Sequence, residues 1–237
     1  MPKTKISSDH LIEIRYEPMG AFLNLRGTLA DFVRRNGMFR QWEIGENRID
    51  FWNANDRQSD PETGFVSFRN CGYSIHNPAT NNYFYDRVGK FLTVLAEFEG
   101  FKYPEILRLG VRSRFYVGVD VSFKTLVNSY SEKCLNPALL GTFGLKTEDL
   151  GITLNLGEAA TKLRVTIGPM NSEQFVKSIS PKAKDEDLED VGIFIDLDYF
   201  IPGLDDSSVN NLIANVKRLH QKCWERKAAV ESYLRAV

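Results

Sequence analysis

ILRLGVRSRFYVGV, residues 106–119, carries the clearest structural signal in this chain. Apolar residues recur at every second position over most of its length, and a period of two predicts a long β-strand. The three arginines share the other parity, so they are expected together on the opposite face. The apolar face is predicted to carry Leu107, Leu109, Val111, Phe115, Val117 and Val119, interrupted by Ser113, and the polar face Arg108, Arg112 and Arg114.

This strand opens the second of two halves that share a similar order of predicted elements. The first half, residues 10–103, is predicted to contain a strand at 10–17, a helix at 21–36, four short strands between 39 and 76, and a helix at 82–99. The second half, residues 104–237, is predicted to contain strands at 106–119, 175–179 and 192–200, a hairpin at 152–168, and helices at 122–132 and 207–236. Residues 1–9, 134–149 and 182–190 are expected to be irregular.

These elements predict an α+β fold in which residues 1–237 form a single structural unit. Each half supplies several strands and a long helix with one apolar face. We therefore expect the two halves to merge into one curved, mostly antiparallel sheet with the long helices packed on one side. The element order resembles the duplicated saddle of the TATA-binding protein, which implies an architecture and no function.

The composition favours a cytoplasmic protein without a membrane segment. The chain has 237 residues, with 30 basic and 31 acidic side chains, so its net charge of −1 gives no overall attraction to nucleic acid or anionic lipid. Cys71, Cys134 and Cys223 are few and far apart, which is typical of a reducing compartment. The sequence contains no apolar run of the length that a signal peptide or a membrane span needs.

Two acidic residues interrupt the apolar strand IFIDLDYF, residues 193–200. Asp196 and Asp198 share one face of this strand, because side chains alternate. If the two strands belong to one sheet, the two acids oppose Arg112 and Arg114, and ion pairing within the sheet explains them. A ligand-binding or partner-binding role for the same face, and a metal or catalytic role, remain open alternatives.

The sequence offers little support for a cofactor, a metal ion or a catalytic residue, and none is predicted. Two carboxylates two residues apart hold Mg²⁺ or Ca²⁺ only with further oxygen ligands, and nearby arginines repel a cation. His10, His76 and His220 do not have the spacing of zinc ligands. His220 lies three residues before Cys223, but on a predicted helix this pair is expected to belong to the core. The common phosphate-binding and nucleophile motifs do not occur.

Basic residues concentrate at two places that could bind a partner. Predicted polar strand faces carry Lys162 and Arg164 besides the three arginines of residues 106–119. The last helix carries basic residues that form either a solvated face or a basic ridge: Lys217, Arg218, Lys222, Arg226, Lys227 and Arg235. Aromatic and basic residues also alternate between 39 and 73, as in proteins that stack nucleic-acid bases, but acidic residues are interleaved equally.

The order of short motifs resembles a sporadically distributed family of uncharacterised bacterial proteins. The resemblance rests on an amphipathic first strand at 12–17, a central strand of Gly-Leu-Arg-Tyr type at 110–113, an Asp-x-Asp strand at 196–199, and a Leu-His pair at 219–220. Ser113 stands where the family has Tyr, and Phe115 where it has a following Asn. The resemblance implies no known activity, and a patchy distribution suggests an association with antiviral defence.

The sequence therefore predicts a non-enzymatic partner-binding or ligand-binding protein of regulatory type, with a protein as the expected partner. A nucleic-acid-binding protein that uses the polar sheet face is the alternative, and a metal-dependent phosphoester enzyme is the second alternative. The candidate binding residues are Arg108, Arg112, Arg114, Lys162, Arg164, Asp196, Asp198, Lys217, Arg218 and Lys222.

Overall fold

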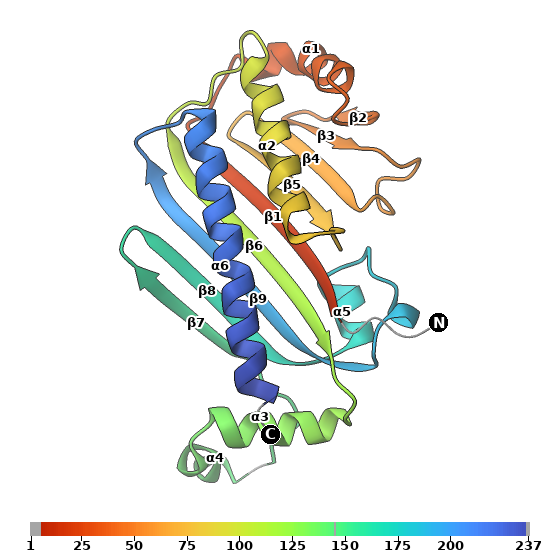
Figure 1. The fold of residues 1–237 in the computed structure, drawn as a ribbon, viewed down its shortest axis with the longest axis vertical. Coiled ribbons are helices and arrows are strands. Elements are labelled where there is room, and N and C mark those ends of the chain that lie inside the picture. Colours follow the sequence, from red (N-terminus) through yellow and green to blue (C-terminus); the bar gives the residue numbers. More distant parts are fainter. Residues whose placement is uncertain (1–5, 145, 236–237) are drawn as a thin grey trace.

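A computed structural model describes residues 6–144 and 146–235 and shows a nine-stranded antiparallel sheet with helices packed against it (Figure 1). The predicted α+β class is confirmed. The first half contains β1 (Ile6–Tyr16), α1 (Phe22–Arg35), β2 (Gln41–Ile44), β3 (Arg48–Trp52), β4 (Glu62–Ser67), β5 (Asn70–His76) and α2 (Asn81–Glu97). The second half contains β6 (Ile106–Gly118), α3 (Phe123–Cys134), α4 (Pro137–Phe143), β7 (Ile152–Glu158), β8 (Thr161–Asn171), α5 (Ser172–Ser178), the 3₁₀-helix η1 (Asp185–Asp187), β9 (Val191–Leu204) and α6 (Val209–Arg235).

The sheet joins the two halves at its centre. The strand order is β2-β3-β4-β5-β1-β6-β9-β8-β7, so each half contributes a continuous block of strands. The first strand of each half, β1 and β6, pair antiparallel along almost their whole length, from Ile6 opposite Val117 to Arg15 opposite Arg108. The edges of the sheet are the four-residue β2 and the seven-residue β7.

The main core lies between the sheet and the two long helices. Helices α2 and α6 lie side by side over the central strands on one face (Figure 1). Val111 and Ile195 point from the sheet into this core, and Leu95 and Leu219 point into it from the helices. The opposite face, which we call the open face, carries the polar side chains of β1, β6 and β9. Burial of one apolar face, at roughly 25 cal/mol per Å² removed from water, explains why the strands alternate as they do.

A second, smaller core covers one end of the open face. It consists of Tyr116, Phe175, Ala183, Leu188 and Phe194, which are all buried. One prediction is wrong here, because residues 175–179 belong largely to helix α5 and not to a strand. Residues 182–190 are largely irregular, as expected, but they bury Ala183 and Leu188 in this core. The short amphipathic pattern around Phe175 fits either element, and packing of its ring against Tyr116 selects the helix.

Two segments that were expected to be irregular contain regular structure. β1 already begins at Ile6, and Ser7, Ser8 and Asp9 are buried because β6 pairs with them. Residues 1–5 lie outside the described residues, as does the predicted end of the last helix at 236. Within 134–149, helix α4 begins after an Asn136 cap and ends at Gly144, whose φ of 62° favours glycine.

The predicted alternation along residues 106–119 fails at its first residues. Leu107 was placed on the apolar face, but its side chain is 45% exposed, whereas Ile106 is buried. Towards β1, the pairing of β6 passes from Ile106 opposite Tyr16 to Arg108 opposite Arg15, so Leu107 is an extra residue in a β-bulge on that side, whereas the register with β9 does not shift. From Arg108 to Gly118 the predicted faces are correct.

Candidate functional surfaces

The open face carries the arginines and aspartates that the sequence singled out, and it pairs them with one another. Arg112 lies opposite Asp198 and Arg114 opposite Asp196 in the sheet register, as predicted. The side chains nevertheless reach diagonally, as they do across twisted strands. Arg112 binds Asp196 through Nε at 2.9 Å and Nη2 at 2.5 Å. Pairing of Asp196 with one of the two predicted arginines is therefore confirmed.

The predicted ion pair of Asp198 with Arg112 or Arg114 is wrong, because a different arginine binds Asp198. Asp198 accepts a hydrogen bond from Arg108 Nη2 at 2.9 Å. Arg114 instead reaches Asp9 of β1, with Nη2 3.8 Å from Oδ2. Burial raises the pKa of Asp198 more than Arg108 and Arg112 lower it. Each aspartate is thus neutralised inside the sheet, an arrangement that opposes binding of a cation.

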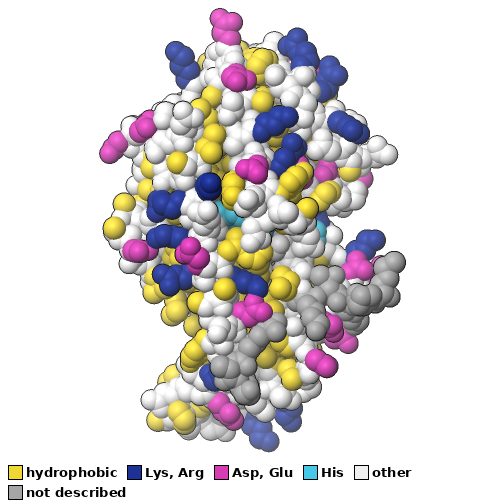
Figure 2. Space-filling view, in the orientation of Figure 1, with side chains coloured by type: hydrophobic (Ala, Val, Ile, Leu, Met, Phe, Trp, Pro, Cys, Tyr) yellow, Lys and Arg dark blue, Asp and Glu magenta, His cyan; other side chains and the backbone are white. Residues whose placement is uncertain are grey.

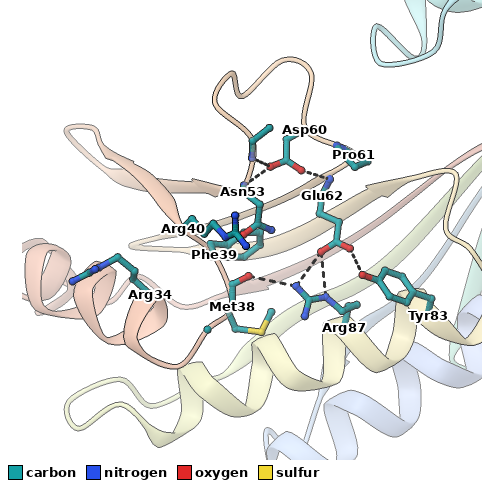
Figure 3. A pocket seen from close by; sticks show the side chains of 12 residues that line it. Arg34, Met38, Phe39, Arg40, Asn53, Asp60, Pro61, Glu62, Tyr83 and Arg87 are labelled. Carbon is teal, nitrogen blue, oxygen red and sulfur yellow. Dashed lines mark hydrogen bonds and ion pairs between the residues drawn. The ribbon is translucent and has the colours of Figure 1, made fainter.

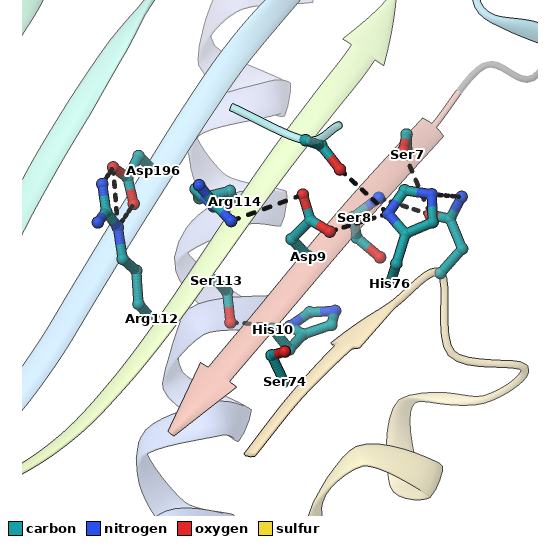
Figure 4. A network of polar contacts seen from close by, with 12 residues as sticks. Ser7, Ser8, Asp9, His10, Ser74, His76, Arg112, Ser113, Arg114 and Asp196 are labelled. Atoms are coloured by element: carbon teal, nitrogen blue, oxygen red, sulfur yellow. Dashed lines mark hydrogen bonds and ion pairs between the residues drawn. The ribbon is translucent and has the colours of Figure 1, made fainter. Parts of the chain in front are cut away.

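Asp9 also belongs to a polar network at the edge of the second core (Figure 4). His76 Nδ1 lies 2.8 Å from Asp9 Oδ1 and 3.2 Å from Ser180 Oγ. Nucleophilic activation of a serine needs its hydroxyl and the carboxylate on different ring nitrogens. Both contact the same nitrogen here, so these three residues tie β1, β5 and the segment after α5 together and do not form a catalytic triad.

The other two histidines lie in the main core, where His220 was predicted. His10 Nδ1 is 2.9 Å from Ser113 Oγ and 3.2 Å from His220 Nε2, and Trp224 Nε1 donates to His220 at 3.3 Å. Burial lowers the pKa of His220 to about 4, and burial together with the charges of His220 and His76 lowers the pKa of His10. Cys223 donates to the carbonyl of Leu197 and not to a histidine. The group is a neutral polar contact between β1, β6 and α6.

Lys162 and Arg164 lie on the open face of β8, near the β7 edge. Both are exposed, and neither makes an ion pair within the described residues. Their neighbours in β7 are small or uncharged, because Lys162 lies opposite Gly157 and Arg164 opposite Asn155. These two cations are thus the candidate binding residues of the open face whose charge is not already neutralised.

An apolar groove runs along the other face of the same edge, between β7, β8 and the second half of α6. Its volume is about 440 Å³, and Leu163, Val165 and Tyr199 form its floor. The side chains of Leu154 and Leu156, on β7 itself, are 45% and 50% exposed. We call this feature the β7 groove.

A row of basic residues on α6 borders the β7 groove, and Figure 2 shows Lys and Arg side chains gathered beside α6 on that side. Arg218 donates to Asn215 at 3.0 Å, Lys222 binds Glu158 at 2.7 Å, and Arg226 donates to the Tyr199 hydroxyl at 3.3 Å. Lys217 lies apart from the row, with its Nζ 5.2 Å from the ring centre of Tyr85. Of the residues predicted to form a basic ridge, Arg218, Lys222 and Arg226 lie in this row, and Lys217 lies outside it.

A large cavity in the first half of the described structure was not predicted from the sequence. It measures about 840 Å³ and lies between the end of α1, the loop after β3 and the first turns of α2 (Figure 3). Its charged lining consists of Arg34, Arg40, Asp60, Glu62 and Arg87. These residues come from separate parts of the chain, so no local motif marks the site; the acids that flank Pro61 are the one local hint. We call it the arginine pocket.

Comparisons with known proteins give no family. No protein-family model matches this chain, and no curated protein matches it. Three chains of solved structures match, among them a rolling circle replication initiator protein from Geobacillus stearothermophilus. It shares 10% sequence identity at a TM-score of 0.28, with 90% of this chain and 80% of that chain covered. A TM-score this low carries no inference. Among the described helices, none is long and apolar enough to cross a bilayer.

Proposed function

We propose that this protein is a non-enzymatic binding protein that holds an extended acidic segment of a partner protein against the edge strand β7. The observation that carries the proposal is the chemistry of this edge: exposed leucines on one face and cations without acidic partners on the other. Both the partner-binding role and the choice of edge are our inference.

The backbone of β7 can pair with an added strand. β7 pairs with β8 on one side, and its other side is a sheet edge. Edge strands usually avoid such pairing with lysine, proline or a bulge. β7 is seven residues long, ITLNLGE, and has neither lysine nor proline nor a recorded register shift. Addition of a strand at such an edge is a common mode of peptide recognition.

The two faces of the edge select the side chains of the added strand. Apolar side chains would lie beside Leu154 and Leu156 and extend the β7 groove. Side chains of the other parity would lie on the open face, roughly 10 Å from β8, since neighbouring strands are about 4.8 Å apart. Glu or Asp at these positions can pair with Lys162, because the β7 residue that lies between them is Gly157, which has no side chain. An alternating apolar and acidic segment therefore fits best.

We expect fluorescence anisotropy to detect binding of a labelled peptide of alternating Val and Glu, and weaker binding of its Val and Lys counterpart. Leu156→Lys places a cation in the apolar face and should weaken binding by about tenfold or more, the value of one buried leucine contact. Lys162→Glu should weaken it by about fivefold, since it turns an exposed attraction into a repulsion.

Gln41→Lys, on the opposite edge strand β2, is the matched control and should leave peptide binding unchanged. Equal binding of the acidic and basic peptides, or unchanged binding to Leu156→Lys, would refute the proposal. A labelled single-stranded oligonucleotide tests the alternative function in the same assay. Oligonucleotide binding that weakens steeply with salt, in the absence of peptide binding, would favour nucleic acid as the partner.

The second alternative, a metal-dependent phosphoester enzyme, gains no support from the site, because Arg108 and Arg112 already neutralise Asp198 and Asp196. A link to antiviral defence stays a prediction from the family resemblance.

A further inference from the structure

The arginine pocket has the size and charge of a binding site for a small anion. Its volume of about 840 Å³ falls within the range of roughly 300–1,000 Å³ that is usual for small-molecule sites. It lies in the first half of the chain, away from the β7 edge, and the proposed function does not use it.

The two acidic residues of the pocket are fully engaged by the protein. Asp60 accepts hydrogen bonds from the backbone N–H groups of Asn53 and Ala54 through Oδ2, and from that of Glu62 through Oδ1. Asp60 is buried and holds the loop after β3 against the start of β4. Its charge is therefore spread over three fixed donors and does not need a cation from outside.

Glu62 is satisfied in the same way by side chains. Tyr83 donates to Oε1 at 2.5 Å, and Tyr73 and Arg87 donate to Oε2 at 2.6 Å and 3.0 Å. Arg87 also donates to the carbonyl of Met38, a buried residue of the lining. The network fixes α2 against β4 and shapes a rigid wall (Figure 3).

The remaining arginines of the lining have no acidic partner. Arg34 and Arg40 are exposed and make no ion pair within the described residues. The backbone N–H of Arg40 bonds to the carbonyl of Trp52, which fixes where its side chain starts, and Figure 3 shows Arg40 between Asn53 and Arg87. Arg34 lies at the rim, with its guanidinium 5.4 Å from the ring centre of Trp42. The lining thus holds three guanidinium groups and two carboxylates, and both carboxylates already have their hydrogen-bond donors within the protein.

We infer that the arginine pocket binds the phosphate or carboxylate group of a small molecule, with Arg40 as the main anchor and Arg34 as a second cation at the rim. A guanidinium group pairs with either oxyanion through two parallel hydrogen bonds. The space beyond Arg40 accommodates the rest of a molecule up to the size of a nucleotide.

Isothermal titration calorimetry of the full chain with inorganic phosphate, ATP without metal, and citrate tests this inference near physiological ionic strength. At least one of the three should bind. Binding of phosphate or ATP would indicate a phosphate group as the ligand, and binding of citrate alone would indicate a carboxylate group. Arg40→Ala should weaken binding by about tenfold or more, the value of a charge-assisted hydrogen bond. Arg40→Lys keeps the charge but loses the two-fold hydrogen bonding, and should retain only part of the affinity.

Arg35→Ala is the matched control, because Arg35 neighbours Arg34 on α1, is exposed, and does not line the pocket. Its affinity should equal that of the unmodified protein, and that of Arg34→Ala should fall by a few-fold. Failure of all three probes to bind, or equal affinities of Arg40→Ala and Arg35→Ala, would overturn the inference. Circular dichroism should show that each variant is folded, since all three arginine side chains are exposed and are not part of the core.

Discussion

His10 and His220 are titratable side chains in a core that is otherwise almost entirely apolar. Burial favours their neutral forms, and His10, Ser113, His220 and Trp224 use one another as hydrogen-bond partners. The same side chains connect three elements, β1, β6 and α6. Protonation of either histidine would place a charge where no acidic side chain contacts its ring within the described residues.

Acidification should therefore destabilise the fold through these histidines. The folded pKa of His220, about 4, lies below its ordinary value of 6.5, so the unfolded chain takes up the proton first. Stability is lost as pH falls from about 6.5 towards 4, and this single group accounts for about 3 kcal/mol when the loss is complete. Urea unfolding at a series of pH values measures the dependence.

His220→Gln keeps a hydrogen-bonding side chain but removes the titration. In this pH range its unfolding free energy should depend less steeply on pH, and the slope should correspond to about one proton fewer taken up on unfolding. The slope is informative even if the variant is less stable at neutral pH. An unchanged slope would contradict the assignment of the pH dependence to His220.

At the scale of elements, α5 shows how one aromatic side chain fixes a short segment. A seven-residue helix is marginal in isolation. Phe175 is fully buried, with its ring centre 5.1 Å from that of Tyr116 and 6.3 Å from that of Phe194. This contact attaches α5 and the segment after it to the open face, separately from the main core.

Phe175→Ala should therefore loosen one region and spare the rest. The cavity should cost about 3–5 kcal/mol of stability, and this loss should be confined to the small second core. Hydrogen exchange followed by mass spectrometry should show faster exchange in α5 and around Leu188, with β1 and β6 still protected. Val176→Ala, at a partly buried neighbour, should change exchange little. Faster exchange throughout the sheet would show that the second core is not a separate unit.

At the scale of the whole molecule, the two halves share one sheet and one main core. β1 of the first half and β6 of the second are central neighbours, and α2 of the first half contacts α6 of the second. Separation of the halves would expose the edges of both central strands and the apolar faces of both long helices.

The chain should accordingly unfold in one cooperative transition. Trp42 and Trp52 lie in the first half and Trp224 in the second, so each half has its own fluorescent reporter. Trp224→Phe leaves the reporters of the first half, and a Trp42→Phe, Trp52→Phe double variant leaves that of the second. In each variant, the urea midpoint from tryptophan fluorescence should coincide with that from far-ultraviolet circular dichroism. A tryptophan midpoint that departs from the circular-dichroism midpoint of the same variant would indicate that the halves unfold separately.

The sequence by itself determined the class of fold and the side of the sheet on which most residues lie. Strand and helix periods are local properties, and they placed Val111 with Ile195 in the core and Arg112 with Asp196 on the open face. They failed at Leu107, where one extra residue shifts the alternation of side chains, because this bulge is set by the pairing of β6 with β1 and leaves no local pattern.

Only the tertiary structure decided which charged residues remain available for a ligand. Arg108, Arg112 and Arg114 are equivalent in the sequence to Lys162 and Arg164, but the first three reach acids on neighbouring strands, and the last two do not. The arginine pocket brings α1, the loop after β3 and α2 together over more than fifty residues of sequence. Ion pairing and cavities depend on distances in space between remote residues, which the order of residues along the chain does not fix.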